Sequence, residues 1–289
     1  LCVVVDDLDM GMTHILRGDD HVNNTPRQLN ILRALGGVEP RYGHIPMILG
    51  PDGKRLSKRH GAVSVMLYRE MGYTPQALRN YLARLGWSHG DQELFSDDEL
   101  KAHFSFGNIQ RSPARFDPDK LGWVNQQWLQ QTPAAELTAE LSFHAERAGY
   151  VWQAGPLADA ALSLLAPRCK TLVDLVGDAA FLFAAPQEWD AKDTAKHVND
   201  ATAGILAAFA DALDRAADWN ADTLQQVAKD TVAACGVGFG KLGMPARLAL
   251  AGRAQAPALD GILLALGREE SLRRLRQFVA TAESRPAAG

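Results

Sequence analysis

The sequence predicts a short α/β segment with a parallel sheet, followed by a much longer helical region. Short runs of β-branched and apolar residues alternate with a helical pattern only before residue 50. Beyond that point apolar residues recur at helical spacing, and Thr-Pro, Asp-Pro and Ser-Asp-Asp-Glu sequences mark helix starts. With 289 residues, the chain is long enough for two or more domains.

The α/β segment combines three short strands with one helix. The strands are predicted at Val3–Asp6, Thr13–Arg17 and His44–Leu49. The helix begins with Thr25 as N-cap and Pro26 in its first turn, and Gly36-Gly37 ends it. In a parallel sheet, ligands bind beyond the carboxyl ends of the strands. We therefore expect the segment from Arg17 to His21, which lies between a strand and a helix, at that rim.

The rest of the chain is predicted to be helical. Helices begin at Thr74-Pro75, Ser96, Asp117-Pro118 and Thr132-Pro133, and further helices cover 172–183, 206–213, 224–235 and 272–279. No strand pattern occurs after residue 136. The run Ala185–Asp190 interrupts the helical pattern and predicts a boundary between two helical subdomains.

Composition excludes several classes of protein. The hydrophobic fraction of 47% is sufficient for cores, and no apolar run reaches the roughly 18 residues of a membrane span. Residues 1–135 carry equal numbers of basic and acidic side chains, so the net charge of −4 comes from 136–289. Binding of RNA would therefore depend on local patches. Cys2, Cys169 and Cys235 form no C-x-x-C pair, which predicts neither disulfide framework nor zinc site and fits a reducing cytoplasm.

A basic loop is the most informative segment. Lys54-Arg55-Leu56-Ser57-Lys58-Arg59-His60-Gly61 carries four permanent cations and follows Gly50-Pro51-Asp52-Gly53, where Pro and Gly suit a type I turn. Cations this dense repel one another unless an anion such as a polyphosphate holds them. A solvated surface loop is the usual alternative for such a cluster. Ser57 between the cations and the apolar segment after Gly61 favour a short, bounded loop.

Several motifs together resemble one enzyme family. Residues 55–59 resemble the K-M-S-K-S loop of class I aminoacyl-tRNA synthetases, and K-L-S-K-R-H-G-A is similar to bacterial glutamyl-tRNA synthetases in particular. Further stretches that resemble this family, in the same order, are 4–7, 13–21, 23–28, 85–88 and 240–247. On this ordered series the chain is identified as a member of the family.

The resemblance also implies a domain organisation. The family's first motif, H-I-G-H, does not occur in this sequence, so we expect a C-terminal part of a longer enzyme. Residues 1–62 would be the remnant of a Rossmann-type catalytic domain, 63–135 a helical stem-contact region, and 136–289 an all-helical anticodon-binding region that is divided near 185–193.

The resemblance assigns roles to the strand rim. Arg17 would bind the amino-acid substrate, since its planar fork can contact both oxygens of a carboxylate; the residues alone equally allow an ion pair with Asp19 or Asp20. Asp20 and His21 would lie near the ATP, although His21 taken alone also fits a histidine at a helix start.

The basic loop would supply the catalytic cations. By resemblance, Lys58 binds ATP and stabilises the transition state, Arg55 replaces the first lysine of the motif, and Ser57 and Arg59 complete the loop. The implied chemistry is attack of the substrate carboxylate on the α-phosphorus of ATP, which is accompanied by Mg²⁺. No protein metal site is predicted.

The helical region would contact tRNA. The predicted contacts are Lys241, Arg247, Arg273 and Arg274, with Arg268 and Arg276 as further candidates. Surface ion pairs with Glu269 or Glu270 are an equally good interpretation of each arginine. Trp123 and Trp128 favour core packing over stacking on bases.

Taken together, the resemblance implies a glutamate–tRNA ligase, a cytoplasmic monomer whose partners are ATP, L-glutamate and tRNA(Glu). This chain is expected to bind tRNA but not to form glutamyl-adenylate alone. The alternatives are a non-catalytic tRNA-binding module and the short paralogue that glutamylates a modified tRNA base, which lacks the helical region.

Overall fold

The computed structural model describes residues 1–56 and 64–283 of the chain. It divides into two compact units, Leu1–Trp128 and Leu129–Gly289. The division falls within helix α6 (Pro118–Gln131). The finer domain boundaries inferred from the sequence stay predictions.

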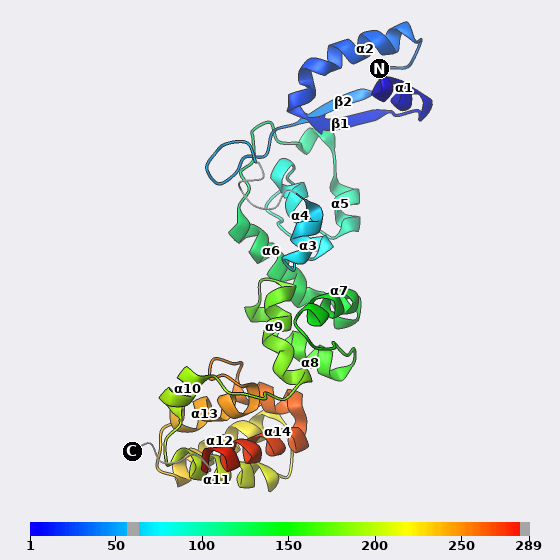
Figure 1. Ribbon diagram of the computed structural model, residues 1–289. Coiled ribbons are helices and arrows are strands. Elements are labelled where there is room, and N and C mark those ends of the chain that lie inside the picture. The colour runs from blue at the N-terminus through cyan, green and yellow to red at the C-terminus, as the bar shows by residue number, and fades with distance from the viewer. Residues whose placement is uncertain (57–63, 284–289) are drawn as a thin grey trace. The chain divides into compact units, whose positions relative to one another are not determined.

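The first unit contains a two-stranded parallel sheet. Strands β1 (His14–Gly18) and β2 (Arg41–Ile45) pair in register from His14 with Arg41 to Gly18 with Ile45. The connection between them holds the 3-10 helix η1 (Asp19–Asn24) and helix α2 (Thr25–Ala34), which lies beside the strands (Figure 1). The predicted parallel sheet with a helical connection is therefore confirmed.

The first predicted strand is wrong, because residues Cys2–Asp9 form helix α1. The run of three valines favours a strand by local propensity. In the helix, however, Val4, Asp7 and Leu8 come to lie on one face, and all three border the same small cavity as Leu32 of α2. Val4 and Leu32 are buried there, so contacts with α2 override the local preference.

The segment after β2 forms a turn with short backbone ladders. Gly53 N–H donates to the Gly50 carbonyl at 3.0 Å, which closes the predicted turn around Pro51. Leu49 pairs with Arg55 on one side and Arg115 on the other. The predicted strand His44–Leu49 overlaps β2 only at His44 and Ile45, because β2 begins at Arg41 and ends at Ile45, and beyond it only isolated bridges form at Leu49.

Four helices complete the first unit: α3 (Val65–Glu70), α4 (Pro75–Gly86), α5 (Asp97–His103) and the start of α6. The 3-10 helix η3 (Phe106–Asn108) follows α5. The predicted caps of α4 and α5 are confirmed. Thr74 accepts a hydrogen bond from Ala77 N–H, and Ser96 forms a capping box with Glu99. Tyr81, Phe116 and Leu121 form part of the buried cluster between these helices.

The second unit is helical throughout its described part. Its α-helices are α7 (Ala134–Arg147), α8 (Pro156–Leu165), α9 (Leu172–Phe183), α10 (Ala191–His197), α11 (Thr202–Asp214), α12 (Ala221–Ala234), α13 (Gly240–Ala251) and α14 (Leu259–Glu283). The 3-10 helix η4 (Ala166–Arg168) follows α8. A kink at Gly267 divides α14. The predicted interruption at 185–190 lies in the connection between α9 and α10, and the subdomain boundary inferred there stays a prediction.

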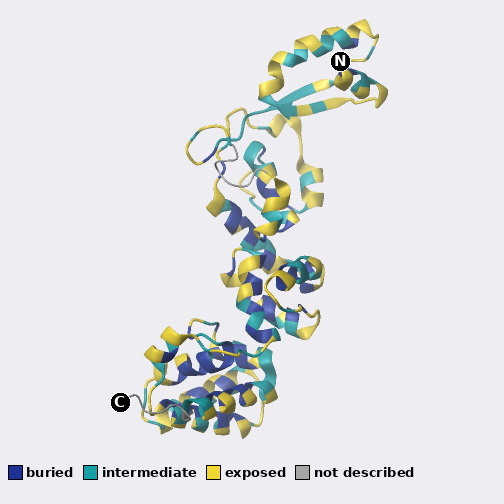
Figure 2. Ribbon diagram, viewed as in Figure 1, coloured by how far each residue is buried: buried dark blue, intermediate teal, exposed yellow. Residues whose placement is uncertain are grey.

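The two units differ in how far they bury their residues. One cluster of buried apolar side chains extends from Leu129 to Phe278, whereas no residue of β1 or β2 is buried (Figure 2). In the described part of the chain, no helix is both long and apolar enough to cross a membrane.

Candidate functional site

The carboxyl ends of β1 and β2 form the rim that the sequence predicted. Arg17 lies opposite His44 in the parallel register, and Gly18 lies opposite Ile45. The chain then turns through η1 into the N-terminus of α2. Side chains from both strands and from α2 therefore meet at one edge of the sheet.

Arg17 is held by a set of neutral groups. Its Nη1 donates to Gln28 Oε1 and its Nη2 to Thr25 Oγ1, both at 2.6 Å. The guanidinium carbon lies 5.1 Å from the centre of the Tyr42 ring. The predicted alternative, an ion pair with Asp19 or Asp20, is not found among the described contacts of Arg17. Burial raises the pKa of Tyr42, so this phenol stays neutral.

Thr25 has a different role from the one predicted. It is the first residue of α2 rather than its N-cap, which is Asn24 and makes no side-chain capping bond. The Thr25 hydroxyl instead lies between Arg17 and His44 Nε2, which is 3.1 Å away. Sequence reasoning did not assign Thr25, Gln28 or His44 to the site. The spacing of Thr25 and Gln28 on one helix face, next to a strand that ends in arginine, was the available signal.

The rim and the base of the basic loop approach each other through Asp20 and Arg55. Arg55 Nη2 lies 3.4 Å from Asp20 Oδ2, and both side chains are exposed. The Asp20 carboxylate also folds back over Gly18, where an added Cβ would lie 2.5 Å from Asp20 Oδ1. His21 lies beside it, with its Nδ1 3.1 Å from Asn24 Nδ2. The structure thus brings together two residues that the sequence assigned to ATP binding and catalysis.

The central residues of the basic loop, Ser57, Lys58 and Arg59, lie outside the described residues. The described start of the basic loop is held in place, because Leu56 N–H donates to the Ile48 carbonyl at 2.9 Å. Leu49 in turn accepts from Phe116 N–H and donates to the Ala114 carbonyl. Since Phe116 belongs to the buried cluster, the loop starts from a fixed base.

Two of the arginines predicted to contact tRNA are engaged within the protein. Arg274 is 4% exposed, and its Nη1 donates to the Phe181 and Leu250 carbonyls at 2.7 Å each. Glu270 accepts from both Arg273 and Arg274. The hydrogen bond from Arg273 makes the largest contribution, and together with that from Arg274 it lowers the pKa of Glu270 to about 2. Arg274 is therefore part of the core, while Arg273 forms the surface ion pair that was the alternative interpretation.

The other two predicted tRNA contacts lie on α13. Lys241 is exposed in its first turn. Arg247 is half-buried, donates from Nε to the Pro257 carbonyl at 2.8 Å, and has its pKa lowered by burial. Arg247 also lines a hollow of about 250 Å³ with Phe239 and Lys229.

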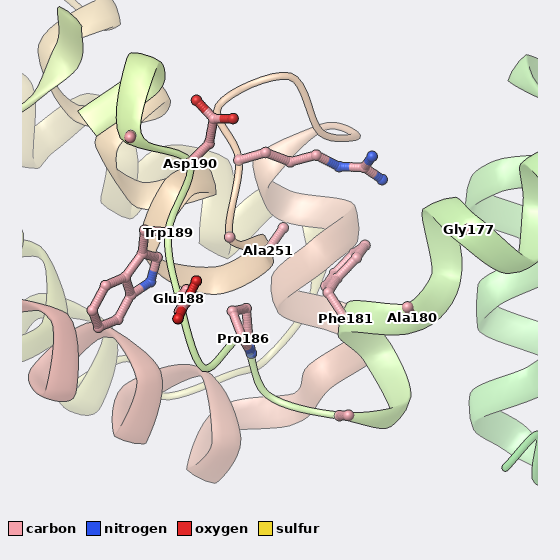
Figure 3. Close-up of a pocket in the computed structure, with 12 residues that line it drawn as sticks. Gly177, Ala180, Phe181, Pro186, Glu188, Trp189, Asp190 and Ala251 are labelled. Carbon is pink, nitrogen blue, oxygen red and sulfur yellow. The ribbon is translucent and has the colours of Figure 1, made fainter. Parts of the chain in front are cut away.

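A larger hollow of about 640 Å³ lies between α9, the loop 184–190 and the end of α13. In Figure 3, Phe181 faces one side of this hollow, and the loop carrying Pro186, Glu188 and Asp190 forms the other. Trp189 turns away from Phe181 and packs its ring against Phe278 at 5.0 Å.

Two guanidinium groups share one carboxylate beside this hollow. Arg253, which lines it, lies 2.7 Å from Asp178 Oδ1, and Arg168 Nε lies 3.6 Å from Asp178 Oδ2. The cluster therefore carries one positive charge in excess. This cluster was not predicted from the sequence, because Arg253 lies 75 residues from Asp178 in the chain.

Trp123 and Trp128, for which core packing was predicted, differ in their surroundings. Trp128 packs on the buried cluster of the first unit and donates from Nε1 to Asn80 Oδ1 at 3.1 Å, as the expectation of core packing implies. For Trp123 that expectation is wrong: it is 38% exposed, with Lys120 Nζ 4.3 Å from the ring centre.

Within the part of the chain that the structure describes, no group of three or more His, Cys, Asp or Glu side chains could hold a metal ion. The three cysteines are unpaired, and burial raises the pKa of the Cys169 thiol to about 12, which makes it unreactive.

Two known families match consecutive parts of the chain. The family described as "tRNA synthetases class I (E and Q), catalytic domain" matches residues 1–123. The family described as "Anticodon binding domain" matches residues 126–279. This order confirms the fold class predicted from the sequence, a catalytic-domain segment followed by a helical anticodon-binding region.

Similar proteins carry the same name in different bacteria. The glutamate–tRNA ligase of Bordetella parapertussis is 49% identical over 95% of this chain and 57% of its own length. That of Francisella philomiragia is 45% identical over 96% of this chain and 60% of its own length. The chain thus spans a little more than half the length of these relatives.

Solved structures are similar as well. A glutamate tRNA ligase from Elizabethkingia meningosepticum in complex with its amino acid superimposes with a TM-score of 0.79 and 29% identity, over 96% of this chain and 59% of that one. The glutamate-tRNA synthetase from Elizabethkingia anophelis gives a TM-score of 0.74 with 28% identity, over 96% and 58%.

Proposed function

The chain belongs to the class I tRNA synthetases of the E and Q type, and we propose that it acts within a glutamate–tRNA ligase. The observation that carries this proposal is the 49% identity to such a ligase over 95% of the chain, across both matched families. The proposed reaction is the activation of glutamate by ATP and its transfer to the 3′ end of tRNA(Glu).

The proposed activation site lies at the rim of the sheet. Arg17 binds a carboxylate of glutamate, and Asp20 and His21 lie on the side of the ATP. Lys58, with Arg55, Ser57 and Arg59, stabilises negative charge on the phosphates while the carboxylate attacks the α-phosphorus. None of these residues acts as a general base, because the attacking carboxylate is already ionised. Mg²⁺ would accompany ATP as the counter-ion of its phosphates.

The proposed tRNA contacts are the cations of the second unit that keep charge available. Lys241 is exposed, and Arg168 and Arg253 share a single carboxylate. Arg273 and Arg247 stay as secondary candidates, because each already has a partner in the protein. We no longer propose Arg274, since its buried guanidinium donates to two backbone carbonyls and Glu270.

We further propose that this chain, taken alone, binds tRNA but does not activate glutamate, since it contains no H-I-G-H sequence. A monomer in the cytoplasm is part of the same proposal. Glutamate-dependent exchange of pyrophosphate into ATP by the purified chain would contradict the proposed lack of activation.

Binding to tRNA tests the proposal directly. The affinity for tRNA(Glu) is compared with that for the same tRNA with a substituted anticodon, across a salt series. We expect a preference for the native anticodon that persists at high salt, and a loss of affinity in Arg253→Ala but not in the matched surface control Arg79→Ala. Equal and steeply salt-dependent binding of both tRNAs would show phosphate contacts only and would refute anticodon reading.

A further inference from the structure

Arg17 is a cation that its described neighbours leave uncompensated. Gln28 and Thr25 accept hydrogen bonds from its two Nη atoms at 2.6 Å, and both acceptors are neutral. Its Nε is buried and has no hydrogen-bond partner among the described residues. The Arg17 side chain as a whole is only half-buried, and in the described part of the chain no carboxylate pairs with it. A half-buried cation without an opposite charge, at the rim of the sheet, points to an anionic ligand.

The acceptors are placed by the fold rather than by chance. Thr25 and Gln28 are three residues apart, on the same face of the first turn of α2. The Thr25 oxygen accepts from Arg17 and lies 3.1 Å from His44 Nε2, and the hydroxyl also has the His21 carbonyl within 3.5 Å as an acceptor. These neighbours hold the hydroxyl oxygen next to the Arg17 guanidinium. The Tyr42 ring beside the guanidinium limits its movement further.

Other arginines of the chain show a contrasting arrangement. Arg273 and Arg274 share Glu270, and Arg79 pairs with Asp97 at 2.7 Å. In each case a carboxylate neutralises the guanidinium. At Arg17 the acceptor is instead the side-chain amide of Gln28, whose oxygen accepts a hydrogen bond as a carboxylate oxygen would but carries no negative charge.

We propose that Gln28 and Thr25 are positioning residues for Arg17, and that their neutrality is what the site requires. They hold the guanidinium in one orientation and leave its positive charge uncompensated for a carboxylate of the substrate. This inference rests on the proposed role of Arg17 in binding the amino acid. It extends that role by naming the two residues that keep the arginine available.

The decisive variant is Gln28→Glu, which keeps the shape of the side chain but adds a carboxylate. If Gln28 has only a structural role, the new ion pair leaves ligand binding unchanged. If neutrality is required, the variant is more stable than the wild type, yet binds L-glutamate roughly tenfold more weakly or worse, because the charge of Arg17 is already neutralised. Gln110→Glu, at an exposed position of the same unit, is the matched control.

Binding is followed through the Arg17 Nε–H resonance in ¹H–¹⁵N spectra, assigned with Arg17→Lys, during titration with L-glutamate. Melting temperatures are measured in parallel without ligand. Thr25→Ser is expected to retain the wild-type signal and affinity, whereas Thr25→Val is expected to broaden the resonance and weaken binding.

The two readouts separate the inference from the proposed function. If L-glutamate does not shift the Arg17 resonance in the wild type, the proposed amino-acid role of Arg17 fails for this chain. The inference is then decided by stability: a higher melting temperature for Gln28→Glu than for Gln110→Glu supports an uncompensated charge at Arg17. Equal melting temperatures, or wild-type glutamate affinity in Gln28→Glu, would overturn it.

Discussion

Replacing Arg274 with alanine is expected to destabilise the second unit strongly, without a specific loss of tRNA affinity. The side chain is 4% exposed and connects α14 to two other helices. Its Nη1 reaches the carbonyl of Phe181 at the end of α9 and that of Leu250 at the end of α13, at 2.7 Å each. Its Nε donates to Glu270 Oε1 at 2.6 Å.

The magnitude follows from the groups that the truncation leaves behind. The Phe181 and Leu250 carbonyls lose a charged donor, and each unsatisfied buried acceptor costs about 1–3 kcal/mol. Glu270 keeps Arg273 as a partner, which reduces the electrostatic part of the loss. We therefore expect about 2–6 kcal/mol for Arg274→Ala, which is the sum for the two carbonyls that lose their donor. Arg273→Ala, at an exposed site, should cost less than about 1 kcal/mol.

Urea unfolding followed by circular dichroism measures the stability, and tRNA binding is measured at a temperature where both variants are folded. Arg274→Lys gives an intermediate case, since a single ammonium cannot reproduce the planar fork. If Arg274→Ala unfolded at the same urea concentration as Arg273→Ala and lost tRNA affinity more than tenfold, Arg274 would be an RNA contact after all, and the reasoning would be refuted.

Two further predictions concern the same unit. The pKa of Glu270 is lowered to about 2 by Arg273 and Arg274, so its stabilising effect is present above pH of about 4.5 and is lost as the pH falls toward 2. Melting temperatures between pH 5 and 2 should therefore fall more steeply in the wild type than in Glu270→Gln, and parallel curves would argue against the ion pair. Gly252 has φ of +80°, and an added Cβ would lie 3.2 Å from Pro186 Cβ, so Gly252→Ala should cost about 1–2 kcal/mol. Gly177→Ala, in α9 with open space around it, should be neutral or stabilising by up to about 1 kcal/mol, and a thermal shift of the same size and sign for both glycines would contradict this account.

The helix starts could be predicted because their signals are local. Thr74 caps α4, and Ser96 and Glu99 cap α5 through bonds that span only three residues. The bounds of α9 agree with the predicted helix at 172–183, because apolar spacing and a break before α10 define both ends. Such features depend on residues close in the chain, which a single sequence displays.

Features that depend on distant partners could not be predicted. Three valines favour a strand locally, yet Cys2–Asp9 is a helix because Val4 packs near Leu32 of α2. The burial of Arg274 depends on carbonyls 93 and 24 residues away. The sequence pattern around Arg274, a run of arginines after two glutamates, is the same for a surface site as for this core position.

Whether an arginine can bind an external anion depends on the charge of the groups that it already contacts within the protein. A guanidinium that already shares a carboxylate gains little from a second one, because the first has removed most of its net charge. Among Arg17, Arg253 and Arg273, this criterion makes Arg17, with its neutral acceptors, the most available for a ligand carboxylate. Arg253 comes next, since it makes one described bond to Asp178, which also lies near Arg168. Arg273 comes last, because both of its bonds to Glu270 are 2.7 Å long. The same ranking should hold for the losses in ligand binding when each arginine is replaced, with glutamate as ligand for the first and tRNA for the other two.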